Sequence, residues 1–276
     1  MVQPQLFDQA YDLPRGGGGV EVGARTASSI LTKATGAIER FCDYSLNPFV
    51  GCAFGCAYCY AAFFVPDERR AREWGEWVDV KVNALALLRR RAAEIAGKSI
   101  LVGSATDPYQ PIEMKTGLTR SLLDFLSRLS PQPKVHVQTR SPCVVRDADL
   151  FGRFDELSVG VSVTTDSEEI RRRFEPKCAS IERRLRAAES LVRAGVRVIL
   201  SVAPMLPMKD PEAFARRLAA VGAHSVWASR FRPTRGDFMA GTRPQALTLA
   251  KELGWDEEAY HTTLQRMRRV LPAMKG

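Results

Sequence analysis

Short apolar segments alternate with helical patterns along most of this chain. The apolar segments are rich in β-branched residues and nearly free of charge, as strands buried on both faces are. They lie at residues 99–103, 134–138, 157–163, 197–202 and 225–229. Between them, leucine and alanine recur at helical spacing over residues 85–95, 118–129 and 185–192. This alternation predicts right-handed β-α-β units and therefore a parallel sheet.

With a first strand near residues 42–46, the pattern repeats about six times, which favours an open, TIM-like partial (β/α)6 barrel over a complete eightfold one. Residues 1–25 show no clear period, and residues 1–40 are expected to form an N-terminal tail or extension. Residues 41–235 would form the barrel. Residues 236–276, with helical patterns at 246–252 and 257–270, would form a C-terminal helical cap.

Composition narrows the class of protein. The chain has 276 residues and a formal net charge of +9. It contains no apolar run as long as a membrane-spanning helix needs, and its first residues lack the apolar stretch of a signal peptide. We therefore expect a cytoplasmic protein without a membrane partner. The positive charge is compatible with a nucleic-acid partner but does not by itself select one.

Three of the six cysteines crowd into one loop after the first expected strand. Cys52, Cys56 and Cys59 have the spacing C-x3-C-x2-C. In a reduced chain such a group indicates metal or redox chemistry rather than disulfides. Three thiolates on one tight loop suit an iron–sulfur cluster. A four-iron cluster would then keep one iron open for a small molecule, as a catalytic zinc ion keeps an open position.

The residues alone also allow a structural zinc site, with Cys42, Cys143 or Cys178 as the fourth ligand. Such a site would belong to a non-enzymatic, zinc-stabilised nucleic-acid-binding protein. However, structural zinc sites usually combine two close ligand pairs, and this sequence has no second pair. The cysteine loop also follows a strand of a predicted parallel sheet, where such folds place their chemistry. Both points favour the cluster.

The cysteine spacing, with Tyr58 just before the last cysteine, resembles the signature of the radical S-adenosylmethionine (SAM) superfamily. The segments YSLNPFVGC (44–52), YCYA (58–61) and TDPYQPIE (106–113) resemble its spore photoproduct lyase-like branch. The resemblance covers about residues 30–235.

The resemblance implies a [4Fe–4S] cluster held by Cys52, Cys56 and Cys59. It further implies reductive cleavage of SAM to a 5′-deoxyadenosyl radical that abstracts hydrogen from a substrate. An electron donor of the flavodoxin or ferredoxin type is expected.

The same resemblance places SAM contacts in the loops that follow the strands. Tyr58 belongs to the expected cofactor-binding set. In the loop after the second strand of the repeat, Ser104, Thr106 and Asp107 are the candidates for the methionyl amino group. The alternative interpretation of this loop is turn chemistry, because Ser, Asp and Pro all favour turns.

Three further SAM contacts are expected from later elements. Arg140, at the end of the third strand, is a candidate for the SAM carboxylate, because a guanidinium presents planar paired donors. Its alternative role is an ion pair with a neighbouring acid. Ser162, in the fourth strand, is expected near the SAM ribose unless it is a core hydroxyl. Arg184 is a second, weaker carboxylate candidate.

The substrate is expected to be a nucleic acid or nucleotide. Spore photoproduct lyase is thought to return hydrogen to its product through a cysteine in the loop after the second strand, but residues 103–107 contain none. This departure argues against thymine-dimer repair. Cys143, in the next loop, is the candidate hydrogen donor, and its alternative role is an inert buried thiol. The alternative function is radical SAM chemistry on a small metabolite or a peptide.

Overall fold

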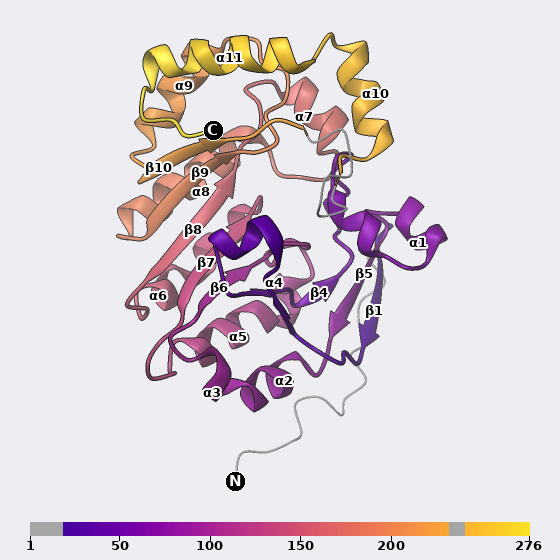
Figure 1. Ribbon diagram of the computed structural model, residues 1–276, viewed down its shortest axis with the longest axis vertical. Helices are drawn as coiled ribbons and strands as arrows, with labels where there is room; N and C mark the ends of the chain where they lie inside the picture. The colour runs from indigo at the N-terminus through magenta and orange to yellow at the C-terminus, as the bar shows by residue number, and fades with distance from the viewer. Residues whose placement is uncertain (1–18, 232–240) are drawn as a thin grey trace.

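The main sheet of the protein is an open run of parallel strands (Figure 1). The structure is a computed structural model that describes residues 19–231 and 241–276. Within these residues the sheet has the order β10-β9-β8-β7-β6-β3-β2. Its strands are β2 (Leu31–Lys33), β3 (Tyr44–Leu46), β6 (Ser99–Val102), β7 (Lys134–Thr139), β8 (Leu157–Ser162), β9 (Arg197–Val202) and β10 (Ser225–Ala228).

Within the main sheet, β3, β6, β7, β8, β9 and β10 lie side by side in chain order and pair in parallel, and only β2 is antiparallel to its neighbour. The sequence prediction of a partial (β/α)6 barrel is therefore confirmed. Val137, Val159 and Leu200 of the central strands are completely buried. This explains why those segments carry so few charges.

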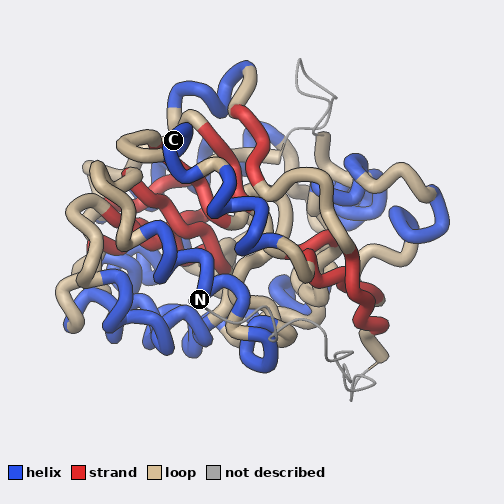
Figure 2. The backbone as a smooth tube through the Cα atoms, turned by 90° about the horizontal axis from the view of Figure 1, so that it is seen from below, coloured by secondary structure: helices blue, strands red, loops and turns tan. Residues whose placement is uncertain are grey.

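Helices flank the strands of the main sheet (Figure 2). The α-helices are α1 (Glu68–Arg72), α2 (Ala84–Arg90), α3 (Ala92–Ile95), α4 (Glu113–Thr116), α5 (Leu118–Leu126), α6 (Ala148–Phe151), α7 (Glu168–Phe174), α8 (Ile181–Arg193), α9 (Pro211–Ala220), α10 (Pro244–Glu252) and α11 (Glu257–Val270). The 3-10 helices are η1 (Gly36–Arg40), η2 (Tyr60–Phe64) and η3 (Pro142–Asp147).

The expected helices are present, with one difference. Residues 85–95 form two short helices, because the chain leaves helical geometry at Arg91 between α2 and α3. In the other helices, the apolar residues predicted from the spacing lie on the buried face. In α5 these include Leu122 and Leu126, and in α8 they include Leu185 and Leu191; each is at most 2% exposed. The N-caps also follow the sequence, since Asp256 caps α11 by accepting a hydrogen bond from a backbone N–H of its first turn.

A second, three-stranded sheet was not expected from the sequence. It has the order β1-β5-β4 and comprises β1 (Glu21–Arg25), β4 (Phe49–Val50) and β5 (Trp77–Lys81). It stands beside the main sheet, next to α1 (Figure 1).

Part of the expected N-terminal tail or extension forms strands. Residues 21–33 supply β1 to the small sheet and β2 to the main one. The segment joins the fold because its backbone groups pair with strands far along the chain. Residues 1–18 lie outside the described part. The division into tail, barrel and cap otherwise stays a prediction.

The C-terminal helices cover the β10 end of the molecule, where α11 lies along α9 (Figure 1). After α11 the chain returns to β10, and the backbone N–H of Lys275 donates to the carbonyl of Val226 at 3.0 Å. Residues 236–240 of the expected cap lie outside the described residues. Among the residues that are described, no helix is long and apolar enough to cross a membrane.

Candidate functional site

A cavity of about 620 Å³ lies where the parallel strands end. Segments at the ends of five of the six parallel strands line it. They are the cysteine loop after β3, residues 103–107 after β6, Gln138 and Arg140 at the end of β7, residues 203–204 after β9 and residues 229–231 after β10. Thr35, Ile38 and Phe41, which precede β3, also line the cavity. Consecutive parallel strands bring these loops together at one end of the sheet.

Cys52, Cys56 and Cys59 all line this cavity. Burial raises the pKa of the Cys52 thiol and raises that of Cys59 to about 11. Burial makes the charged thiolate form unfavourable, and coordination to a metal would offset this cost, because a coordinating thiol is deprotonated. Among the described residues, no three His, Cys, Asp or Glu side chains converge on one metal ion. An iron–sulfur cluster takes each thiolate at a different iron, so three thiols on one wall are a donor set that fits it.

The buried amide of Gln110 fixes the start of the cysteine loop. Its Oε1 accepts from the backbone N–H of Ala53 at 2.8 Å, and its Nε2 donates to the carbonyl of Gly51 at 3.3 Å. Further along, Gly55 and Gly75 touch through their backbones. A Cβ on Gly75 would lie 2.6 Å from the Cα of Gly55. The loop therefore has little freedom to move.

The segment that follows α7 supports the other side of the cysteine loop. We call residues 174–178 the anchor segment. The backbone N–H of Ala57 donates to the carbonyl of Phe174 at 2.8 Å. Next to it, the Sγ atoms of Cys56 and Cys178 lie 3.8 Å apart, and both side chains are buried. This contact lowers the pKa of Cys56, whereas burial raises that of Cys178 well above its usual value.

Glu175, in the anchor segment, is the centre of a buried polar network. Its Oε1 accepts from the hydroxyl of Tyr58 and, at 3.0 Å, from that of Thr164, and it lies 3.5 Å from Nε of Arg140. Its Oε2 lies 2.6 Å from a terminal nitrogen of Arg184. Burial would raise the pKa of Glu175, but Arg184 and Arg140 outweigh it and hold the pKa below its usual value. Glu175 could not be predicted from the sequence, because a lone glutamate before a proline carries no specific signal.

Arg140 presents its guanidinium to the cavity. Its Nε donates to the Tyr58 hydroxyl at 3.2 Å. Its two terminal nitrogens have no hydrogen-bond partner among the residues that the structure describes. Paired, unengaged N–H donors on a cavity wall match a carboxylate.

Asp107 lines the same cavity, but its carboxylate is occupied by the protein. One oxygen accepts from the hydroxyl of Thr139 at 2.6 Å and from the backbone N–H of Tyr109 at 2.9 Å. The other accepts from the backbone N–H of Arg140 at 2.6 Å. Burial raises the pKa of Asp107. The geometry makes this residue a support for Arg140.

Ser104 and Thr106 also line the cavity, and Asn47 holds their loop. Its Oδ1 accepts from the backbone N–H groups of Ala105 and Thr106 at 2.9 and 3.2 Å. Its Nδ2 donates to the Ser104 hydroxyl at 3.0 Å. The sequence analysis did not single out Asn47, although it follows directly after β3, where polar residues of this fold gather.

Two expected SAM contacts lie outside the cavity wall. Arg184 is completely buried and donates to the carbonyls of Ala179 and Ser162 at 2.9 and 3.3 Å, besides its pairing with Glu175. The Ser162 hydroxyl is 1% exposed and accepts from Nε2 of Gln138 at 2.9 Å. Both groups are occupied inside the protein, and Gln138 lines the cavity in front of Ser162.

Cys143 does not line the cavity either. After β7 the chain turns into η3, where the Ser141 hydroxyl accepts from the backbone N–H of Cys143 at 3.3 Å. This 3-10 helix packs against α8, in the helical layer. The expected hydrogen-donor role of Cys143 therefore has no support in the geometry.

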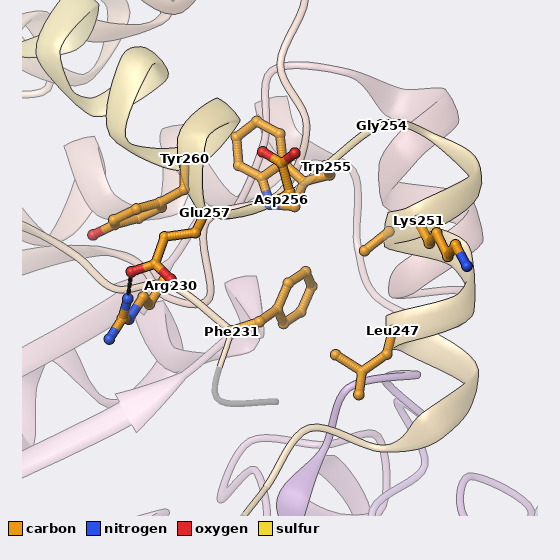
Figure 3. A pocket seen from close by; sticks show the side chains of 10 residues that line it. Arg230, Phe231, Leu247, Lys251, Gly254, Trp255, Asp256, Glu257 and Tyr260 are labelled. Carbon is orange, nitrogen blue, oxygen red and sulfur yellow. Dashed lines mark ion pairs between the residues drawn. The ribbon is translucent and has the colours of Figure 1, made fainter. Parts of the chain in front are cut away.

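A second cavity of about 420 Å³ lies between α10 and the start of α11 (Figure 3). Arg230 and Phe231 line both cavities. The Phe231 ring stacks on Phe174 with a centroid distance of 6.0 Å. Trp255 and Tyr260 supply further aromatic wall, and the indole N–H of Trp255 donates to a backbone carbonyl. Apolar side chains make up much of this cavity wall, and Arg230 and Glu257 form an ion pair on it.

The chain is similar in sequence to several proteins. The uncharacterized protein MJ0683 of Methanocaldococcus jannaschii is 32% identical over 164 residues, which are 59% of this chain and 61% of that protein. The chain thus spans less than two thirds of that relative. The uncharacterized protein Rv2578c of Mycobacterium tuberculosis is 28% identical over 243 residues, 82% of this chain and 71% of the relative.

Solved structures share the fold. A variant of spore photoproduct lyase superposes with a TM-score of 0.63 at 17% identity, covering 92% of this chain and 80% of that one. Another spore photoproduct lyase structure, with a TM-score of 0.61, contains AdoMet and a dinucleoside spore photoproduct. The family model of the radical SAM superfamily matches residues 46–219. The chain therefore belongs to the radical SAM superfamily, whose enzymes use a [4Fe–4S] cluster together with SAM.

Proposed function

We propose that Cys52, Cys56 and Cys59 hold the [4Fe–4S] cluster and that the cavity beside them receives SAM. The observation that carries this proposal is the placement of three thiols and one unengaged guanidinium on the walls of one cavity. When bound, the cluster and SAM supply a 5′-deoxyadenosyl radical for hydrogen abstraction. A flavodoxin- or ferredoxin-type protein would donate the electron.

The residues around the cavity have separable roles. Arg140 would bind the SAM carboxylate through its two terminal nitrogens. Ser104 and Thr106 would border the methionyl amino group. Tyr58 and Glu175 would orient Arg140, because both lie beside its Nε. Arg184 would keep Glu175 ionised rather than bind SAM itself.

For the substrate we propose a nucleotide or a single-stranded nucleic acid. Three aromatic side chains of the cavity wall are exposed to solvent: Phe41 at 64%, Phe64 at 54% and Tyr60 at 36%. Trp227 lies edge to face with Phe41 at a centroid distance of 6.1 Å. Exposed aromatic rings next to a cavity suit the faces of nucleobases, which stack at about 1–3 kcal/mol each. Spore photoproduct lyase, whose fold this chain shares, is solved with a dinucleoside.

The cofactor assignment is tested by anaerobic reconstitution with iron and sulfide. We expect about four irons per chain and 5′-deoxyadenosine after reduction with SAM. Alanine at any of the three cysteines should abolish both. A protein that instead holds about one zinc per chain and no iron would support the zinc-stabilised alternative.

The substrate assignment is tested by the affinity for a fluorescently labelled single-stranded oligonucleotide at several salt concentrations. Phe41→Ala and Phe64→Ala should each weaken binding about fivefold or more. Met114→Ala is the matched control, because Met114 is 48% exposed and does not line the cavity. Absent or salt-independent binding would favour a small metabolite or a peptide instead.

A further inference from the structure

A fourth thiol lies directly beside one of the three proposed cluster ligands. Sγ of Cys178 is 3.8 Å from Sγ of Cys56, within the range of a hydrogen bond between sulfur atoms. A cysteine that ligates iron does so as a thiolate and has no proton to donate. In this contact the proton therefore belongs to Cys178, and Cys56 is the acceptor.

We propose that the Cys178 S–H group donates a hydrogen bond to the Cys56 thiolate and thereby raises the reduction potential of the cluster. The inference rests on the proposed role of Cys56 as a cluster ligand. The physical reason is electrostatic. Reduction adds negative charge to the cluster, and part of that charge resides on the ligand sulfurs. A donor aimed at such a sulfur stabilises the reduced form more than the oxidised one, so hydrogen bonds to the sulfurs are among the groups that set the potential.

The backbone of Cys178 is held in place on both sides. Its N–H donates to the carbonyl of Glu175 at 3.1 Å. Its carbonyl accepts from a terminal nitrogen of Arg171 at 2.9 Å, and Arg171 is itself buried at 7% exposure. These contacts fix the distance from Cys178 to the ligand it faces, as a positioned donor requires.

The position of Cys178 distinguishes a donor from a fourth ligand. Cys52, Cys56 and Cys59 line the cavity, whereas Cys178 does not. It is buried in the same apolar cluster as Cys56 and Phe174. A thiol at this position reaches the ligand sulfur and leaves the cavity side of the site to SAM.

The experiment compares Cys178→Ala and Cys178→Ser with the wild-type protein and with Cys143→Ala as the matched control. Each is loaded anaerobically, its iron is counted, and its cluster potential is measured without SAM by redox titration followed by electron paramagnetic resonance. We expect full iron content in all four proteins. The potential of Cys178→Ala should move to a more negative value, while Cys178→Ser, which keeps a donor, should stay nearer to the wild type.

A wild-type potential in fully loaded Cys178→Ala would overturn the inference. If Cys178→Ala does not take up iron, Cys178→Ser decides between the roles. A loaded Cys178→Ser protein with a near wild-type potential would support a hydrogen-bond donor. Loss of iron in Cys178→Ser as well would contradict the donor role, because it would mark Cys178 as a ligand or a structural residue. A wild-type chain that takes up no iron would instead contradict the proposed function.

Discussion

The carboxylate of Asp107 accepts the backbone N–H of Arg140 at 2.6 Å and so joins the loop after β6 to the loop after β7. Its other oxygen accepts from Thr139 and Tyr109. One buried carboxylate thus organises two neighbouring strand ends. The backbone at Arg140 therefore depends on a cavity-wall carboxylate that already accepts three hydrogen bonds from the protein.

Replacing Asp107 with alanine should weaken SAM binding without removing a direct contact to it. The change leaves buried N–H and O–H donors without acceptors, at about 1–3 kcal/mol each, and releases the backbone of Arg140. We expect a lower unfolding temperature and a SAM dissociation constant raised about tenfold or more, measured by calorimetry on the loaded protein. Asp149→Ala, at a more exposed site, is the control. Unchanged SAM affinity in Asp107→Ala would show that Arg140 is positioned by other groups.

Replacing Arg140 with lysine should show whether the paired donors, rather than the charge alone, bind SAM. Lysine keeps the charge but presents no planar pair of N–H groups. Loss of a charge-assisted hydrogen bond corresponds to about 1.5–3 kcal/mol, so the dissociation constant should rise about 10- to 100-fold in Arg140→Ala and by less in Arg140→Lys. Arg183→Ala, on the exposed face of α8, should bind SAM normally. Wild-type affinity in Arg140→Ala would assign the SAM carboxylate to another residue.

Cys143→Ala should retain the cluster and the cleavage of SAM. Its thiol lies in η3, outside the cavity wall, so its loss removes no group from the site. The measurement is iron content and 5′-deoxyadenosine formed per chain. Cys56→Ala is the contrasting variant and should lose both. A loaded Cys143→Ala protein that no longer turns over substrate would restore the hydrogen-donor role that the sequence suggested.

The sequence predicted the main sheet well because each of its signals is local. A buried parallel strand is a short apolar run wherever it occurs, and the spacing of Cys52, Cys56 and Cys59 places three thiols on one loop without reference to the rest of the chain. The small sheet carries no such signal. Its strand Glu21–Arg25 is charged and half exposed, and it exists only because residues 77–81 lie beside it.

The two arginines show the same limit within the site. Arg140 directly follows β7 and Arg184 lies in α8, and both were candidates for the SAM carboxylate. Their roles separate through Glu175, which takes the guanidinium of Arg184 into the protein interior and leaves the terminal nitrogens of Arg140 unengaged. Glu175 lies far from Arg140 in the sequence, and its contacts with the two arginines form only in the folded chain. Asn47 and Gln110, which hold the two loops, were missed for the same reason.

The buried pair of Glu175 and Arg184 should make the stability of the protein depend on pH in the acid range. The pKa of Glu175 is held below its usual value near 4.5 in the folded state, burial being outweighed by Arg184. The unfolded chain therefore binds more protons than the folded one as the pH falls, and the stabilisation is complete above about pH 4.5 and is lost as the pH drops toward the folded pKa.

Glu175→Gln removes this titration and leaves Arg184 buried without a counter-charge. We expect the free energy of unfolding at pH 7 to fall by about 3–5 kcal/mol, and the decline of that free energy below pH 4.5 to become shallower. Urea unfolding between about pH 3 and pH 7 measures both effects. Glu156→Gln is the control, because its ion pair with Lys134 is 59% exposed on the glutamate side and contributes little. Wild-type stability of Glu175→Gln at pH 7 would show that Arg184 finds another partner. That result would contradict the proposal that Glu175 connects Arg184 to Arg140.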